Sequence, residues 1–168
     1  MTFAQSLSLR LAVQNRARHP IIFEEALHTY FAISNIKDIA IDGLAGTTYV
    51  DKIDVARRKP QTAALVTITA EIDRVYLDIP GDASFVDRRW HRRVVIEKEG
   101  AASSVVWNPW AEKATAMVDL GDTAWHSMVC VEAGNLADND VRLAADAEHL
   151  MSTAISVDAQ VLTCWPRD

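Results

Sequence analysis

Apolar and polar residues alternate along much of this chain, and a period of two is the spacing of a β-strand that buries one face. The first run shows it most clearly, because Leu7, Leu9, Leu11 and Val13 alternate with mainly polar neighbours. We expect further extended segments at residues 21–33, 36–41, 47–53, 63–70, 73–78, 89–97, 104–107, 128–133 and 150–165. Many short strands separated by turn sequences predict an all-β sandwich or barrel.

Few segments break this pattern. Residues 111–119 have the composition of one or two helical turns. Residues 136–149 are weakly patterned, so we expect a surface loop there. No linker or internal repeat divides the chain, so we predict one domain over residues 1–168.

Composition and charge exclude several classes of protein. Hydrophobic residues make up 49% of the chain and charged residues 24%, which is ordinary for a globular domain. The net charge of -6 disfavours nucleic acid or an anionic membrane as the main partner. No run reaches the roughly 18 apolar residues of a membrane span, and the first residues lack the pattern of a signal peptide. We therefore expect a soluble cytoplasmic protein.

Neither the cysteines nor the isolated histidines form a recognised motif. Cys130 and Cys164 show no CxxC spacing, which fits a reducing cytoplasm better than a disulfide framework. His19, His126 and His149 have no metal-binding spacing, and the chain contains no P-loop or GxGxxG sequence. We predict that the protein uses no metal and no cofactor.

Two ionisable residues interrupt apolar strands. His28 lies in residues 27–31 (LHTYF) and Glu132 in residues 131–135 (VEAGN). An ionisable group in a dry interior costs free energy unless it is paired or used, so both positions are candidates for function. The residues alone leave alternatives open: Glu132 as a structural ion pair or calcium ligand, and His28 as a satisfied core histidine.

The period of two also predicts the surroundings of these residues. His28 and Tyr30 share one face of their strand, and Glu132 shares a face with Met128 and Cys130. We expect burial to raise the pKa of Glu132, which would make it a better base near neutral pH. A carboxylate and an imidazole suit paired proton transfer, because their ordinary pKa values of about 4.3 and 6.5 lie close to neutrality.

Four strings in this order resemble a known family. They are LHTYF (27–31), EIDRVY (71–76), VVWNPW (105–110) and VEAGN (131–135). Together they resemble the later portion of the glucose-6-phosphate 1-epimerases (hexose-6-phosphate mutarotases), a branch of the aldose 1-epimerases. The resemblance implies a galactose-mutarotase-like β-supersandwich, N-terminally truncated relative to the family. The strands and most of the phosphate-binding arginines of the family's first half have no counterpart here.

The resemblance also implies an activity and a site. The expected reaction interconverts the α and β anomers of an aldohexose, with glucose 6-phosphate as the expected substrate. Glu132 matches the family's catalytic glutamate as general base, and His28 matches its catalytic histidine as general acid. The expected sugar-binding residues are Asp73, Trp107, Asn108 and Tyr30. Their structural alternatives are an Asp–Arg pair that caps a strand and a pair of core tryptophans beside Pro109.

Other interpretations stay open at this point. The chain is alternatively a non-catalytic carbohydrate-binding or assembly module, a decayed family member, or half of a site completed by another chain. The basic residues 88–93 suit a nucleic acid, although a solvated strand is the favoured interpretation. Glu24 and Glu25 are expected to face solvent. Missing strands would leave an open sheet edge, which favours a homo-oligomer.

Overall fold

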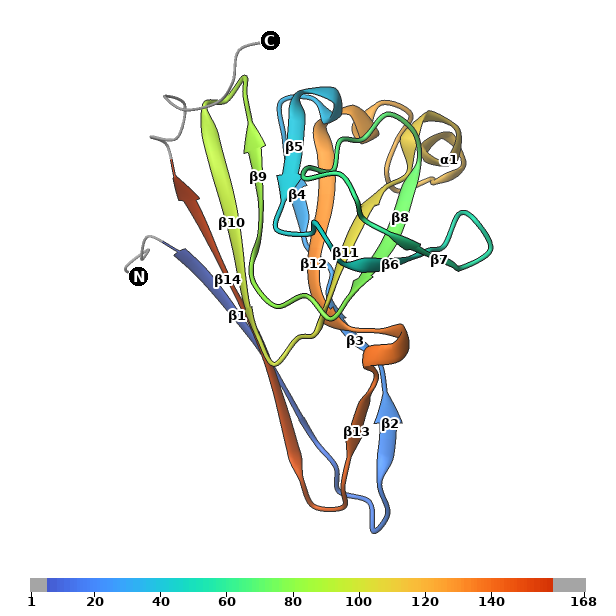
Figure 1. Cartoon of the computed structure of the whole chain (residues 1–168), viewed down its shortest axis with the longest axis vertical. Helices are drawn as coiled ribbons and strands as arrows, with labels where there is room; N and C mark the ends of the chain where they lie inside the picture. The colour runs from blue at the N-terminus through green and yellow to red at the C-terminus, as the bar shows by residue number, and fades with distance from the viewer. Residues whose placement is uncertain (1–5, 159–168) are drawn as a thin grey trace.

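The computed structural model describes residues 6–158 and shows two main antiparallel β-sheets that pack against each other (Figure 1). The first has five strands in the spatial order β1 (Ser6–Gln14), β14 (Glu148–Asp158), β10 (Arg92–Glu99), β9 (Ala83–Asp87) and β5 (Ile39–Asp42). The second has seven: β3 (Glu25–Leu27), β12 (Met128–Asn135), β11 (Ser103–Asn108), β8 (Ile72–Leu77), β6 (Thr48–Asp51), β7 (Arg57–Pro60), and β4 (Tyr30–Ala32), which also pairs with β12. The predicted all-β sandwich is confirmed.

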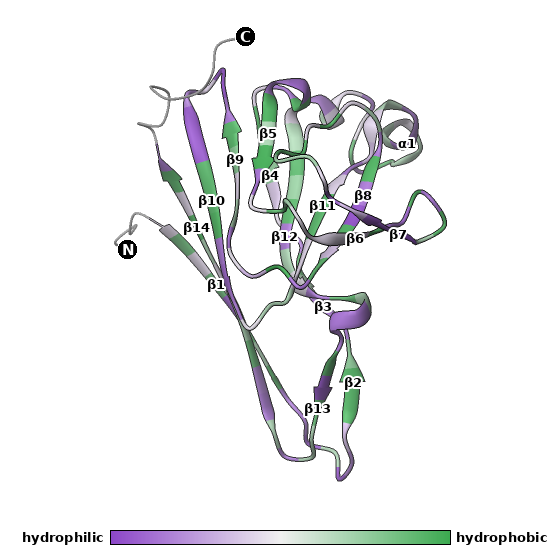
Figure 2. Cartoon of the chain, viewed as in Figure 1, coloured by the Kyte–Doolittle hydropathy of each residue, from purple (hydrophilic) through white to green (hydrophobic). Residues whose placement is uncertain are grey.

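Smaller elements complete the described chain. A two-stranded ribbon of β2 (Ile21–Phe23) and β13 (Val141–Leu143) extends away from the sandwich, and Figure 2 shows that β2 is its apolar strand. The helices are short: η1 (Ile36–Asp38), α1 (Trp110–Ala116), η2 (Ala124–Ser127) and η3 (Ala137–Asn139). Within residues 6–158, none of them is long and apolar enough to cross a membrane.

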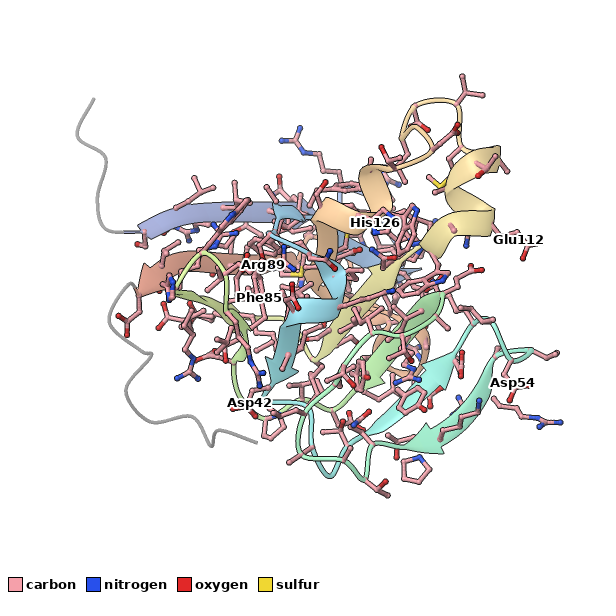
Figure 3. The ribbon with its side chains drawn as sticks, turned by 90° about the horizontal axis from the view of Figure 1, so that it is seen from above. Asp42, Asp54, Phe85, Arg89, Glu112 and His126 are labelled. Atoms are coloured by element: carbon pink, nitrogen blue, oxygen red, sulfur yellow. The ribbon has the colours of Figure 1, made fainter. Side chains whose placement is uncertain are left out.

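The main core lies between the two sheets. Phe85 and Ile96 enter it from the five-stranded sheet, and Tyr76, Val106 and Val131 enter it from the seven-stranded sheet. Figure 3 shows Phe85 inside the molecule, whereas Asp54 and Glu112 lie at its periphery. These residues point inward from their strands. The alternation of apolar residues in the sequence therefore identifies the strand face that packs in the core.

A second apolar cluster covers the opposite face of the seven-stranded sheet. Its members are Val50, Val75, Leu77, Val105, Trp107, Met128 and Cys130. All residues of β11 and β12 are consequently buried, on both faces of the sheet. This double burial explains why these two strands read as nearly continuous apolar runs, in which a polar residue stands out.

Several predicted strand limits were wrong. Residues 63–70 contain only an isolated bridge from Val66 to Ile41, and residues 36–41 begin with the helix η1 before β5 starts. Residues 21–33 form three separate short strands. The predicted loop at 136–149 contains η3 and β13. The strand at residues 63–70 was predicted from strand propensity alone. Propensity does not tell whether a sheet has a free edge with which the segment can pair.

The basic segment, residues 88–93, begins with a turn, and the strand predicted over residues 89–97 is confirmed only from Arg92 onward. Residues 88–91 connect β9 to β10, which begins only at Arg92, and Arg89 (Figure 3) lies 2.6 Å from Asp38 Oδ2. Arg92 stacks over the Trp90 ring and donates to the Ala32 carbonyl. Arg93 hydrogen-bonds to the Ser84 hydroxyl. These three arginines are therefore engaged within the protein.

Glu25 is buried, and the prediction that it faces solvent was wrong. Its Oε1 atom lies 2.7 Å from Nε2 of His149 and accepts a hydrogen bond of 2.9 Å from the Asn135 amide. The same amide donates to the Gly100 carbonyl. The contacts link β3, β12 and β14, so they hold the two sheets together at the base of the sandwich. The end of β14 agrees with the prediction as far as Asp158, and the rest of the predicted 150–165 segment lies outside the described residues.

Candidate active site

His28 lies directly opposite Glu132 in the seven-stranded sheet. The edge formed by β3 and β4 is interrupted at residues 28–29, but Leu27 pairs with Ala133 and Tyr30 pairs with Cys130. The register is the same on both sides of the interruption, which places His28 across from Glu132. Nδ1 of His28 lies 3.2 Å from Oε1 of Glu132.

The two side chains differ sharply in exposure. The Glu132 side chain is 5% exposed, whereas the His28 side chain is 51% exposed. Glu132 is held by β12, which is paired on both edges, and His28 belongs to the interrupted outer edge. The arrangement is a buried carboxyl group beneath an imidazole that solvent and a ligand can reach.

Strand register gathers further side chains on the same face. Val105 pairs with Glu132, and Trp107 pairs with both Cys130 and Asp73. Paired residues of neighbouring strands point to the same face of a sheet. A cavity of about 270 Å³ opens there, lined by Ala26, His28, Lys52, Asp73, Val105, Trp107, Glu132 and Leu136. A few convergent polar groups in a partly apolar cavity are characteristic of small-molecule sites.

Aromatic rings hold the imidazole in place. The Tyr30 ring stacks on His28 with a centroid distance of 4.8 Å and an interplanar angle of 7°. Trp107 meets both rings edge to face, at 5.9 Å from His28 and 6.0 Å from Tyr30. This packing restricts rotation of the His28 side chain and keeps one nitrogen directed at Glu132.

Burial shifts both Glu132 and His28 toward their neutral forms. Burial raises the pKa of Glu132 to about 7, helped by the Asp73 carboxylate and opposed by the Lys52 ammonium group. Burial lowers the pKa of His28 below its usual 6.5, with the Asp73 charge acting in the opposite direction. Both shifts favour the neutral form of each group, so the pair keeps one proton, held mainly by Glu132, until the pH rises to about 7.

Most of the residues predicted for the site come together in the structure. His28, Glu132, Asp73 and Trp107 all line the cavity, and Tyr30 contacts it through its stack on His28. The structure thus groups residues from four strings that are far apart in the sequence.

Asn108 lies elsewhere. Its amide donates to the carbonyl groups of Trp125 and Met128, both at 2.9 Å, and its Oδ1 accepts from the backbone N–H of Trp110. The side chain is fully buried and holds the corner between β11 and α1. Asn108 does not line the cavity, and its hydrogen bonds stabilise the chain around the end of β11.

Lys52 is a cavity residue that the sequence reasoning missed. Its Nζ atom lies 4.0 Å from Oδ1 of Asp73. Lys52 follows directly after β6, and β6 pairs with β8 through Asp51 and Arg74. That long-range pairing brings the lysine to the site, and no local pattern in the sequence signals it.

The chain is similar in sequence to the aldose 1-epimerase family and to proteins named as glucose-6-phosphate 1-epimerases. The sequence profile described as aldose 1-epimerase matches residues 1–156. A protein from Cenchrus ciliaris named "Putative glucose-6-phosphate 1-epimerase" is 35% identical over 127 residues, which are 76% of this chain and 39% of that protein. A protein of the same name from Escherichia coli K12 is 33% identical over 108 residues, which are 64% of this chain and 36% of that protein.

Solved structures share the fold. A "putative mutarotase" from Salmonella typhimurium superposes with a TM-score of 0.80 and 24% identity, covering 91% of this chain and 50% of its own. A "galactose mutarotase related enzyme" from Lactobacillus acidophilus has a TM-score of 0.70 and 15% identity, covering 94% of this chain and 59% of its own. The sandwich is therefore galactose-mutarotase-like, and the chain spans about two fifths of the length of the curated relatives. Because the family profile covers nearly all of the described residues, the chain belongs to the aldose 1-epimerase family.

Proposed function

We propose that the chain is a mutarotase that interconverts the α and β anomers of an aldohexose, with glucose 6-phosphate as its substrate. The observation that carries the proposal is the 3.2 Å contact between His28 Nδ1 and Glu132 Oε1 at a cavity that also contains Asp73. Family membership supports the reaction type, and the names of the Cenchrus ciliaris and Escherichia coli proteins support the 6-phosphate.

The reaction needs one proton acceptor and one proton donor. In the form of the pair that carries its single proton on His28, the Glu132 carboxylate takes the proton of the anomeric hydroxyl while the His28 ring gives a proton to the ring oxygen. The bond between the anomeric carbon and the ring oxygen breaks, and an open-chain aldehyde forms. Rotation about the adjacent carbon–carbon bond and closure on the other face return both protons and give the other anomer.

The remaining cavity residues suit sugar binding. The Asp73 carboxylate accepts hydrogen bonds from sugar hydroxyls, and the aromatic faces of Trp107 and Tyr30 suit the C–H face of a pyranose. Lys52 adds a positive charge beside Asp73 at the same cavity. We assign Lys52 to the binding of the substrate's anionic group, because it is the cationic residue among those that line the cavity in the described chain.

The test is exchange NMR between the anomers of glucose 6-phosphate, with the wild type and Glu132→Gln measured side by side. Faster exchange with the wild type but not with the variant supports the enzyme. Binding of glucose 6-phosphate without any acceleration by the folded wild type would instead favour the alternative, a carbohydrate-binding or assembly module. Free glucose measured in parallel decides whether the phosphate contributes to recognition.

We also propose that a second copy of this chain covers the edge strand β1. In the described chain β1 pairs only with β14, and Leu7 on its inner face is 58% exposed. The strand has no proline and a single charged residue, Arg10, so its free edge is open to pairing.

Light scattering after size exclusion tests this assembly. A dimer that Leu9→Lys converts to a monomer supports pairing along β1. A monomer at every concentration overturns it.

The net charge and the internal partners of Arg89, Arg92 and Arg93 argue against nucleic acid as a partner. We propose a cytoplasmic location, because the cysteines show no disulfide pattern.

A further inference from the structure

A thiol lies next to the proton-transfer pair. A ring nitrogen of His28, the sulfur of Cys130 and a carboxylate oxygen of Glu132 all lie within 4.8 Å of one another. Cys130 precedes Glu132 by two residues on β12, so both side chains point to the same face. Cys130 is fully buried, and its partners in the neighbouring strands are Tyr30 and Trp107.

These three donor atoms form a set that suits zinc. Structural and catalytic zinc sites use cysteine sulfur, histidine nitrogen and carboxylate oxygen, with metal–ligand distances of roughly 2.0 to 2.3 Å. At such distances two ligands of a tetrahedral ion lie roughly 3.3–3.7 Å apart. The 3.2 Å separation between His28 Nδ1 and Glu132 Oε1 is already close to that value.

The third ligand requires an adjustment of the site. The three donor atoms lie within 4.8 Å of one another, so binding a metal ion shortens the longest separation by up to about 1.5 Å. His28 is half exposed and lies at the strand interruption, so we expect its ring to supply this movement by shifting within its stack on Tyr30. The fourth coordination position then faces the cavity, where water or a ligand oxygen can enter. The Asp73 carboxylate lines the same cavity and adds favourable negative charge.

We propose that His28, Cys130 and Glu132 bind a Zn²⁺ ion, and that the ion competes with the sugar because it occupies both proton-transfer groups. Binding of the ion displaces two protons from the site. The Cys130 thiol loses its proton to solvent, and the proton shared by His28 and Glu132 is released as well, leaving thiolate, imidazole and carboxylate ligands. Because these protons must be displaced, zinc affinity is expected to increase with pH.

Titration with Co²⁺ and Zn²⁺ in the absence of sugar tests the site. Co²⁺ bound to a thiolate gives a near-ultraviolet charge-transfer band that oxygen and nitrogen ligands do not give. We expect this band with the wild type and its loss in Cys130→Ser and Cys130→Ala. We also expect Zn²⁺ affinity to fall by about 100-fold in both variants, because even outer partners of a zinc ligand are worth 10–100-fold.

Cys164→Ser is the matched control, since Cys164 is the other cysteine of the sequence and lies outside the described residues. It keeps the band and the affinity if Cys130 is the ligand. No thiolate band in the folded wild type would overturn the site, and so would equal Zn²⁺ affinity in the wild type and both Cys130 variants. Circular dichroism of each variant establishes that it is folded.

A second measurement tests the competition separately. Zn²⁺ affinity is measured with and without saturating glucose 6-phosphate. A weaker apparent affinity in the presence of the sugar supports overlapping sites, and an unchanged affinity with demonstrated sugar binding overturns the competition. The metal titrations use no turnover, so a failure of the zinc site is distinguishable from a failure of the proposed mutarotase activity.

Discussion

Nδ1 of His28 and Oε1 of Glu132 lie 3.2 Å apart, with the imidazole half exposed and the carboxyl group almost completely buried. The asymmetry follows from their strands. Glu132 belongs to β12, which has neighbours on both sides, and His28 belongs to the interrupted edge beside it. A dry carboxyl group and a reachable imidazole are the arrangement that paired proton transfer requires.

Replacing His28 by glutamine is expected to slow anomer exchange by about 10²–10⁴-fold, the usual contribution of one acid–base group. Glutamine retains a polar side chain but has no titrating proton. Exchange NMR with glucose 6-phosphate measures the effect, and His126→Gln is the control, because His126 stacks on Trp125 away from the cavity. Equal losses in the two variants would argue against a role for His28 in proton transfer.

Activity is expected to follow a bell-shaped dependence on pH, because the active pair carries one proton. Below the lower pKa the pair holds two protons and Glu132 is no longer a base. The alkaline limb falls at about pH 7, where burial places the pKa of Glu132 and the pair loses its last proton. The pH dependence of the exchange rate gives both limbs, and activity rising steadily above pH 7 would contradict the assignment.

Two charge substitutions are expected to move the alkaline limb in opposite directions. Lys52→Met raises the pKa of Glu132 further, because the lysine charge lowers it, so the limb moves to higher pH. Asp73→Asn removes a charge that raises this pKa, so the limb moves to lower pH. Lys113→Met is the control. The Lys113 side chain pairs with Glu71 and not with a cavity residue, so we expect this variant to leave the limb in place. The measurement is the pH profile and not the absolute rate, because both site variants also weaken sugar binding.

Glu132 is expected to cost the protein stability at alkaline pH. Its pKa is about 7 in the folded protein and about 4.5 when exposed. Folding therefore binds a proton between these values, and stability declines as pH rises from 4.5 through 7. A shift of this size corresponds to up to about 3 kcal/mol above pH 7. Urea unfolding followed by tryptophan fluorescence should show Glu132→Gln more stable than the wild type at about pH 8.5, with no difference at low pH.

Glu25→Ala is expected to reduce the free energy of unfolding by about 2–3 kcal/mol, because it removes the carboxylate partner of His149 and one of the acceptors of the Asn135 amide. Glu24→Gln is the matched control. Glu24 is exposed and accepts a hydrogen bond from the Ala137 N–H, which glutamine can still accept. Chemical denaturation compares the two variants, and similar stabilities would show that the contact between the sheets contributes little.

Local patterns predicted the all-β sandwich, and they singled out His28 and Glu132, which the structure places in contact. The alternation around His28 and Glu132 correctly separated the core-facing residues Val129 and Val131 from those on the site face. The register between strands distant in sequence was not predictable, because it depends on pairing and not on local propensity. For this reason Lys52 in the cavity and the burial of Glu25 emerged only from the structure.

Strand β12 contributes residues to the cavity, to the main core and to the contact between the two sheets. It carries Glu132 on one face, Val131 in the main core on the other, and Asn135 at the contact between the sheets. It pairs with β11 on one edge and with β3 and β4 on the other, and the outer pairing is interrupted only opposite residues 28–29, so a small local opening is not expected to release the Glu132 carboxyl group. Amide hydrogen exchange along β12 is therefore expected to proceed mainly through global unfolding, so that the Glu132 carboxyl group stays in place until the whole fold is lost.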